Sequence, residues 1–337
     1  MAHDAPSIAA DPRKRIVGPV LRSQGALIAL LLVLVFGALR YDHFLGAENA
    51  GFLLGSTAKF GLLAIGMAFV ILSGGIDLSV GTVAVLASVV AAQLSPHGIA
   101  PAIAGAVAVG LAFGLVNGFV IARFRLMPFV VTLCTFMAAR GLALVVSGRE
   151  TVSISYEAGY DQLAESAWLG LTLPTWIMLA AFALGALMLR YSRFGRAVLA
   201  VGGNEEAARL MGVPAARVKM AVYALSGALA GLAGAILAAQ TSGSPTEGTG
   251  WELVAIAAVV VGGTRLSGGQ GSVLNTLTGV LLLAVILNLI NFENGYTSGP
   301  HLSLGSYWQT VVRGGFLLAV VLLQARLAHR PGGPVRT

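Results

Sequence analysis

The stretch "FGLLAIGMAFVILSGGIDLSVGTVAVLASVVAAQL", Phe60 to Leu94, contains the features that decide the fold. It consists of two apolar runs that are separated by a short polar segment containing Gly74, Gly75 and Asp77. A hydrocarbon core of about 30 Å is crossed by roughly 20 helical residues, so apolar runs of this kind indicate membrane-embedded helices. Adjacent glycines between two such helices indicate a break in the helix or a tight turn.

The whole chain has the composition of this stretch. Of its 337 residues, 57% are hydrophobic and 10% are charged, and the mean hydropathy is +0.85. An average soluble domain carries roughly 25% charged residues, so too little polar surface is left for a soluble fold. The composition predicts an all-α, polytopic membrane protein embedded in a lipid bilayer.

Apolar blocks along the chain predict about ten membrane-spanning helices. The block from Phe60 to Leu72 and the block from Trp251 to Val261 are short, and each runs into a Gly-Gly pair, so we expect broken helices there. The ten predicted spans are Gly25 to Leu39, Phe60 to Leu72, Ser79 to Leu94, Ala100 to Ile121, Phe129 to Val146, Leu173 to Leu189, Met220 to Ala239, Trp251 to Val261, Gly271 to Ile290 and Val311 to Leu327.

The basic residues predict the orientation of these spans, because cytoplasmic loops of membrane proteins collect Lys and Arg. With the N-terminus inside, most basic residues fall in inside loops, and Arg40, Lys59 and Arg149 fall outside. We therefore expect a multi-pass membrane protein with a cytoplasmic tail at residues 1–24, a membrane domain at residues 25–327 and a second cytoplasmic tail at residues 328–337. The positive-inside bias explains the net charge of +7 without a nucleic-acid partner.

Several other classes of site are not predicted. The chain has one cysteine, Cys134, and its five histidines are not at ligand spacing, so the sequence gives no metal or cofactor site. The letters LSGGQ at residues 266–270 resemble the signature of ATP-binding cassette ATPases, yet no Gly-Lys pair of a phosphate-binding loop occurs in the chain. The machinery for ATP hydrolysis is therefore not predicted in this chain, and this protein is not expected to be an enzyme.

The LSGGQ letters have an internal parallel. "GGTRLSGG", Gly262 to Gly269, agrees with "GGIDLSVG", Gly74 to Gly81, at five positions, and both segments follow a short apolar run. This agreement predicts two pseudo-repeated halves. The segments are either helix breaks that line a pathway, in which Gly74, Gly75, Gly262 and Gly263 take part, or simple hairpins between helices.

Charged residues near or within the spans are candidates for the translocation pathway, because a charge at membrane depth is costly unless it is paired or hydrated. Asp77 and Ser79 either belong to the pathway or cap the following helix. Arg140, Glu252 and Arg313 are also pathway candidates; alternatively, each arginine pairs with a carboxylate such as Glu252 or with helix carbonyls. Tyr307 and Gln309 are candidate substrate contacts, because an aromatic face beside an amide would suit a sugar, although aromatic residues such as Tyr307 also form belts at membrane interfaces.

Five stretches together resemble the permease subunits of bacterial ABC importers for monosaccharides such as ribose, xylose, arabinose and galactofuranose. They are "VILSGGIDLSVGTVAVLASVVAA", "MPFVVTLCTFMAARGLALVVSG", "GGNEEAARLMGVPAARVK", "WELVAIAAVVVGGTRLSGG" and "SYWQTVVRG". The resemblance implies a ten-helix permease that pairs with a second permease subunit, identical or different. It also implies a cytoplasmic ATPase and an external sugar-binding protein as partners. The segment Ile290 to Gly295 is similar to the galactofuranose branch, whereas the family's Asp in "ELDAIAAV" is Val254 here.

The predicted inside loop at residues 190–219 contains the motif that suits contact with such an ATPase. Asn204 is expected to cap a short helix, Glu205 and Glu206 favour its first turn, and Gly212 followed by Pro214 ends it. Ala207 and Ala208 keep this helix slim, and Leu210, Met211 and Val213 supply an apolar docking surface. The resemblance implies a coupling helix that receives motion from the ATPase; the alternative is a helix that rests at the lipid headgroups.

The sequence therefore predicts the membrane subunit of an ATP-driven sugar importer. A stand-alone secondary transporter or channel, with Asp77 and Arg140 as an ion or proton relay, remains the alternative.

Overall fold

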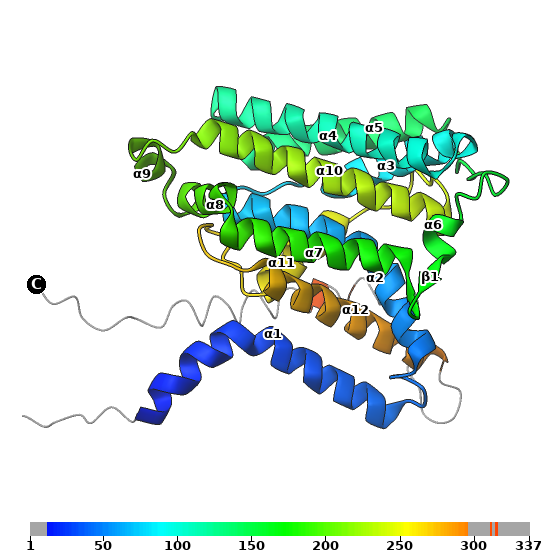
Figure 1. Ribbon diagram of the computed structural model, residues 1–337, viewed down its shortest axis with the longest axis horizontal. Helices are drawn as coiled ribbons and strands as arrows, with labels where there is room; N and C mark the ends of the chain where they lie inside the picture. Colours follow the sequence, from blue (N-terminus) through cyan, green and yellow to red (C-terminus); the bar gives the residue numbers. More distant parts are fainter. Residues whose placement is uncertain (1–11, 296–310, 312–313, 316–337) are drawn as a thin grey trace, which may run out of the picture.

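The computed structural model describes residues 12–295, 311 and 314–315 (Figure 1). Within these residues the regular structure is helical, apart from one small hairpin and one isolated bridge between Val152 and Gly243. The hairpin has two strands of two residues each, β1 (Ala167–Trp168) and β2 (Leu171–Thr172). The prediction of an all-α membrane protein is confirmed.

Seven of the described helices are long and apolar enough to cross a membrane. Two shorter apolar helices accompany them, α11 and the part of α1 from Gly25 to Arg40. These nine correspond to the first nine predicted spans, and the predicted tenth, Val311 to Leu327, lies almost wholly outside the described residues. The helices in question are α1 (Pro12–Arg40), α2 (Ala47–Leu72), α3 (Val80–Leu94, followed by the 3-10 turn Ser95–His97), α4 (Ile99–Phe124), α5 (Pro128–Val146), α7 (Leu173–Tyr191), α10 (Ala215–Thr241), α11 (Trp251–Val261) and α12 (Val273–Gly295).

The predicted short span Phe60 to Leu72 is wrong at its start, because α2 begins at Ala47 and has 26 residues. Lys59 therefore lies within this helix, whereas the sequence placed it in an outside loop. Its ammonium group donates a hydrogen bond of 2.8 Å to Gln240 Oε1 on α10, which gives the charge a polar partner inside the protein. The second short helix, α11, has the predicted bounds.

The centre of the molecule is α10, which packs against α4, α3 and α2. Its contact with α4 is close because both helices carry glycines at a spacing of four residues. Cβ atoms built on Gly227 and Gly231 of α10 would collide with backbone atoms near Gly110 and Ala106 of α4. Small residues at such spacing are typical of close helix packing in membranes, where no hydrophobic effect drives helices together.

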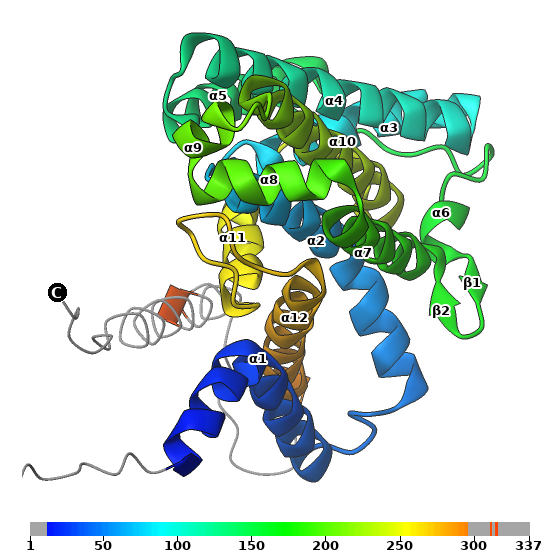
Figure 2. The same cartoon turned by 60° about the vertical axis from the view of Figure 1, so that its left-hand side comes forward.

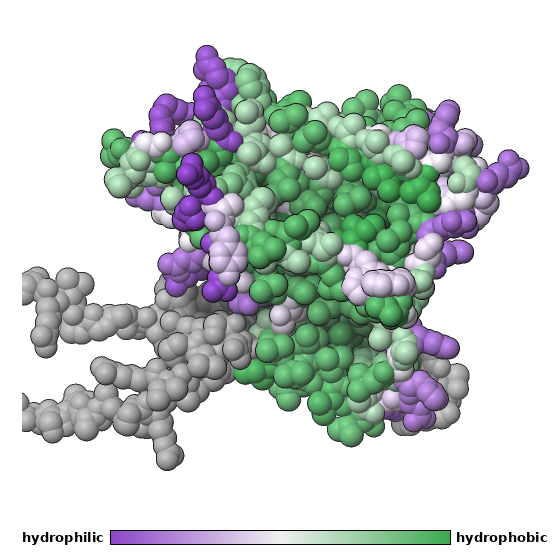
Figure 3. Space-filling view, in the orientation of Figure 1, coloured by the Kyte–Doolittle hydropathy of each residue, from purple (hydrophilic) through white to green (hydrophobic). Residues whose placement is uncertain are grey.

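The two loops predicted on opposite sides of the membrane lie at opposite ends of the helix bundle (Figure 1). The short helices α8 (Arg193–Gly203) and α9 (Glu205–Leu210) are at one end, and α6 (Gln162–Glu165) and the β1–β2 hairpin are at the other. Between the ends the surface is mainly hydrophobic, and polar residues gather at both ends (Figure 3). This distribution fits a bilayer that surrounds the middle of the bundle.

The segment between α5 and α7 is anchored to the bundle by Tyr160. The side chain of Tyr160 is fully buried, and its hydroxyl donates a hydrogen bond of 2.9 Å to the carbonyl oxygen of Ala235 on α10. Burial raises the pKa of this phenol, so the hydroxyl remains a donor at alkaline pH.

Helix α1 packs against α12 at one side of the bundle (Figure 2). The rings of Tyr41, Phe44 and Phe292 form a cluster there, and Glu293 accepts a hydrogen bond from the Tyr41 hydroxyl and lies 3.9 Å from Arg40. The segment Ile290 to Gly295 therefore holds α12 against the connection between α1 and α2.

Candidate functional site

Helix α9 has six residues, and it begins after Asn204 and ends before Gly212, as the sequence motif predicts. The Asn204 side chain accepts a hydrogen bond of 2.9 Å from the backbone N–H of Ala207, so the predicted cap is confirmed. Glu205 and Glu206 occupy the first turn, and Glu205 lies 2.5 Å from Lys219 at the start of α10. Gly212, with φ +82°, turns the chain back after the helix.

The tip of α9 carries an apolar pair that nothing in the described structure covers. Leu210, the last residue of α9, and Met211 are each 84% exposed. Helix α9 lies at one end of the bundle, where polar residues gather (Figures 1 and 3). The other small and apolar residues of the motif differ from one another: Ala207 is exposed, Ala208 is buried, and Val213 packs against the core. The predicted docking surface is therefore narrower than the sequence indicated, because Val213 faces the protein itself.

Both Gly-Gly pairs lie where a helix ends, α2 at Leu72 and α11 at Val261, and the backbones of these two helix ends, called the helix breaks below, are alike. The N–H groups of Gly74 and Gly75 bond to Ile71 and Val70, as those of Gly263 and Thr264 bond to Val260 and Val259. Gly74 and Gly263 have φ +84° and +86°, so each helix ends in the same left-handed cap. By this geometry Gly74 corresponds to Gly263, one residue away from the alignment that the sequence letters suggest.

The side chain of Asp77 is buried and lies in the first break. Its Oδ1 accepts hydrogen bonds from the Ser79 backbone N–H (3.0 Å) and hydroxyl (2.6 Å), and its Oδ2 accepts one from the Ser226 hydroxyl of α10 (3.0 Å). Asn117 of α4 donates to the Ser79 hydroxyl, and Thr135 of α5 donates to Asn117.

Asp77 orders the turn before α3, but the predicted cap is wrong: Ser79 occupies the N-cap position of α3 and no side chain there makes a cap hydrogen bond, because the Asp77 carboxylate is bound by the Ser79 N–H and hydroxyl and by Ser226. The chain of hydrogen bonds through Ser79, Asn117 and Thr135 also connects this break to α4 and α5. Asn117 and Ser226 were missed by sequence reasoning, although an amide within an apolar helix such as α4 is a usable signal.

Arg140 and Glu252 approach the same short segment. Arg140 is exposed on α5 and donates a hydrogen bond of 3.2 Å to the hydroxyl of Thr249, which lies three residues before Glu252. Glu252 is 9% exposed, and its Oε2 has no hydrogen-bond partner among the described residues. The guanidinium therefore bonds to a hydroxyl, whereas the sequence suggested a carboxylate or helix carbonyls.

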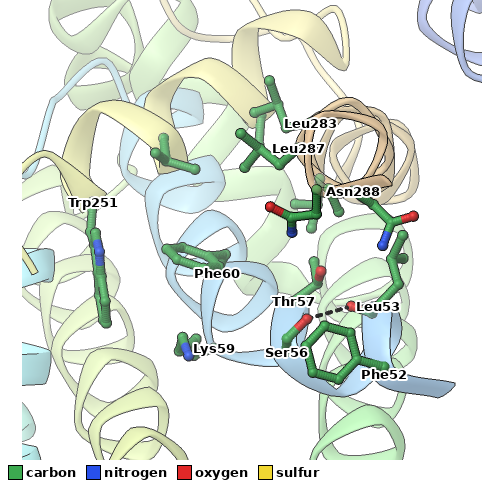
Figure 4. A pocket seen from close by; sticks show the side chains of 15 residues that line it. Phe52, Leu53, Ser56, Thr57, Lys59, Phe60, Trp251, Leu283, Leu287 and Asn288 are labelled. Carbon is green, nitrogen blue, oxygen red and sulfur yellow. Dashed lines mark hydrogen bonds between the residues drawn. The ribbon is translucent and has the colours of Figure 1, made fainter. Parts of the chain in front are cut away.

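A cavity of about 310 Å³ lies between α2, α11 and α12, beside this segment (Figure 4). Phe60 and Trp251 meet there with ring centroids 5.1 Å apart, and the Lys59 ammonium lies 5.7 Å and 5.8 Å from these rings. The Asn288 amide is paired with Asn49 of α2. The sequence did not predict this cavity, because its lining combines α2 with α11 and α12, which are far from α2 in the chain.

The structure therefore brings Arg140 and Glu252 to one segment and places Asp77 and Ser79 in a separate buried cluster. The predicted coupling residues, in and next to α9, lie at one end of the bundle. Tyr307, Gln309 and Arg313 lie outside the described residues.

Comparison with known proteins gives the family. Residues 49–321 match the family described as "Branched-chain amino acid transport system / permease component", and the chain belongs to this family. Curated relatives over the same length are sugar permeases. The chain is 40% identical over 311 residues to the ribose import permease protein RbsC of Bacillus subtilis, which covers 91% of this chain and 94% of that protein. It is 38% identical to the L-arabinose transport system permease protein AraH of Escherichia coli over 308 residues, 90% of this chain and 91% of that protein.

Proposed function

We propose that this chain is the transmembrane subunit of an ATP-driven importer for a monosaccharide. In this proposal a separate cytoplasmic ATPase subunit hydrolyses ATP, a second permease subunit completes the pathway, and an extracytoplasmic binding protein delivers the sugar. The permease itself makes and breaks no covalent bond. The N- and C-termini are cytoplasmic, and the protein lies in the bacterial inner membrane.

The observation that carries the proposal is the exposed tip of α9. A capped helix that presents Leu210 and Met211 to solvent, beyond the hydrophobic belt, suits a groove on a soluble partner. Exposed apolar side chains at such a position indicate an interaction site. Relatives named as ribose and arabinose import permeases support the same assignment.

The depth of Arg140 in α5 indicates which face of that helix is directed away from lipid. It lies six residues before the end of α5, which places it roughly 9 Å along the helix from that end. An exposed arginine at this depth is costly in lipid. We therefore place the face of α5 that carries Arg140, together with Thr249 and Glu252, toward the pathway or the second permease subunit.

The substrate class is a pentose or a related monosaccharide, and galactofuranose is the specific candidate from the Ile290 to Gly295 segment. Competition by unlabelled ribose, arabinose and galactofuranose against uptake of each labelled sugar will identify it. A pattern in which galactofuranose does not compete excludes that candidate.

The test of the function is reconstitution. The chain, co-purified with its ATPase subunit and placed in proteoliposomes with the binding protein, is expected to import sugar with ATP and without a proton gradient. Uptake that persists without the ATPase and stops when the proton gradient is collapsed contradicts the proposal and favours the stand-alone transporter.

A further inference from the structure

Three segments that are far apart in the sequence meet at one point, next to α9. They are the end of α2 with Gly74, the end of α8 with Gly202, and the loop after α11 with Gly268 and Gly269. We call these four glycines the glycine junction. The backbone N–H of Gly269 donates a hydrogen bond of 3.0 Å to the Leu72 carbonyl, which joins the two helix breaks directly.

The contacts in the glycine junction are between backbones, and at Gly202, Gly268 and Gly269 they leave no room for a side chain. A Cβ atom on Gly202 would lie 2.7 Å from the nitrogen of Gly269 and closer still to the Leu72 carbonyl oxygen. A Cβ on Gly268 would lie 2.8 Å from the carbonyl oxygen of Gly202 and 2.9 Å from the Cα of Gly74. Backbone atoms cannot move aside as a flexible side chain does, so these distances exclude any larger residue without displacement of a segment.

The position of the glycine junction in the chain gives it a mechanical consequence. Gly202 and Gly203 directly precede Asn204, the cap of α9. On the other side, Gly74 is three residues before Asp77, whose hydrogen bonds reach α4, α5 and α10. The loop with Gly268 and Gly269 connects α11, which carries Glu252, to α12. A displacement of α9 therefore acts on both helix breaks through rigid contacts.

We propose that the glycine junction transmits movement of α9 to both helix breaks as one rigid body, and that Gly202 is a positioning residue for transport. This inference rests on the proposed function, in which α9 receives movement from the ATPase. Contact between segments does not by itself show that they are coupled, so the inference is tested by measuring the coupling between ATP hydrolysis and sugar uptake. Gly202 has no role in binding sugar or the ATPase in this proposal.

The neighbouring glycine provides a matched control. A Cβ on Gly203 would meet nothing within 4 Å, whereas one on Gly202 would collide with two segments. We expect Gly202→Ala to lower the number of sugar molecules imported per ATP hydrolysed by about 2- to 30-fold, the range for mutations that alter coupling. Gly203→Ala is expected to leave this ratio unchanged. Affinity for the ATPase subunit is expected to be unchanged in both variants.

The outcomes separate the inference from the proposed function. If the unmodified protein imports sugar with ATP and Gly202→Ala retains the full ratio, the glycine junction does not transmit the movement. A loss of stability with an unchanged ratio assigns Gly202 to packing alone and likewise overturns the inference. If the unmodified protein shows no ATP-dependent uptake, the proposed function itself fails.

A second experiment does not depend on the folding of Gly202→Ala. In a Cys134→Ser background, Gly203→Cys and Gln270→Cys place two thiols on the two sides of the glycine junction, to be joined by a short bis-maleimide. A rigid body tolerates this link, so we expect the cross-linked protein to transport at the rate of the unlinked double variant. Transport that stops on cross-linking while ATP hydrolysis continues shows that the two sides move against each other, and contradicts the inference.

Discussion

Replacing Leu210 and Met211 of α9 by alanine is expected to weaken binding of the ATPase subunit strongly. Each substitution removes three non-hydrogen atoms, and each side chain is 84% exposed in the described structure. Burying a methylene group contributes about 0.8 kcal/mol, so each truncation costs about 2 kcal/mol when the partner covers the side chain fully. That corresponds to about 30-fold in affinity for one substitution and at most about 1000-fold for both.

The measurement is the dissociation constant between the permease in nanodiscs and its isolated ATPase subunit. Leu169→Ala is the matched control, because Leu169 is 74% exposed in the turn between β1 and β2, at the other end of the bundle. Substitutions of exposed side chains usually change stability by less than about 0.5 kcal/mol, so folding is expected to be retained. Equal affinity of the double alanine variant and the unmodified protein refutes docking through this tip.

Three further predictions concern other parts of the site. Asn204→Ala removes the cap hydrogen bond from the Ala207 N–H and is expected to destabilise α9 by about 1 kcal/mol. Hydrogen exchange of the α9 amides is then expected to be faster, and Asn204→Asp is expected to restore the slower exchange. Equal exchange in the unmodified protein and both variants contradicts the cap. Ser226→Ala removes one hydrogen bond to Asp77 and is expected to lower the free energy of unfolding by about 1 kcal/mol. Asp77→Ala also leaves the two Ser79 donors without a partner and is expected to lower it further. Thermal unfolding in detergent measures both variants, and an Asp77→Ala protein as stable as the unmodified one argues against the network. Arg140→Leu removes the hydrogen bond to Thr249 and is expected to reduce sugar uptake, whereas Arg140→Lys keeps a positive charge and is expected to retain part of it. Full uptake by the leucine variant contradicts the placement of this face of α5 toward the pathway or the second subunit.

The sequence was sufficient for the parts that depend on local rules. The cap at Asn204, the end of α9 before Gly212 and the bounds of α11 follow from side chains that act on their own backbone within a few residues. The long apolar helices follow from the cost of unpaired backbone groups in lipid, which applies to each span separately.

The remainder depends on contacts between distant segments. The start of α2 was missed because Lys59 interrupts its apolar run, and only the position of Gln240 on α10 shows that this charge is accommodated in the helix. The prediction that Val213 belongs to the docking surface was wrong for the same reason, because Val213 packs against core residues from distant parts of the chain. The glycine junction could not be predicted either, because its three segments are separated by more than 60 residues and meet only through backbone atoms.

The central claim is that α9 lies on the cytoplasmic side, where a soluble ATPase can reach it. In a Cys134→Ser background, Met211→Cys and Leu169→Cys place single thiols on the exposed tips at the two ends of the bundle. A membrane-impermeant maleimide is then applied to inside-out and right-side-out vesicles. The account predicts labelling of Met211→Cys only in inside-out vesicles and of Leu169→Cys only in right-side-out vesicles. Labelling of Met211→Cys from the outer side contradicts it.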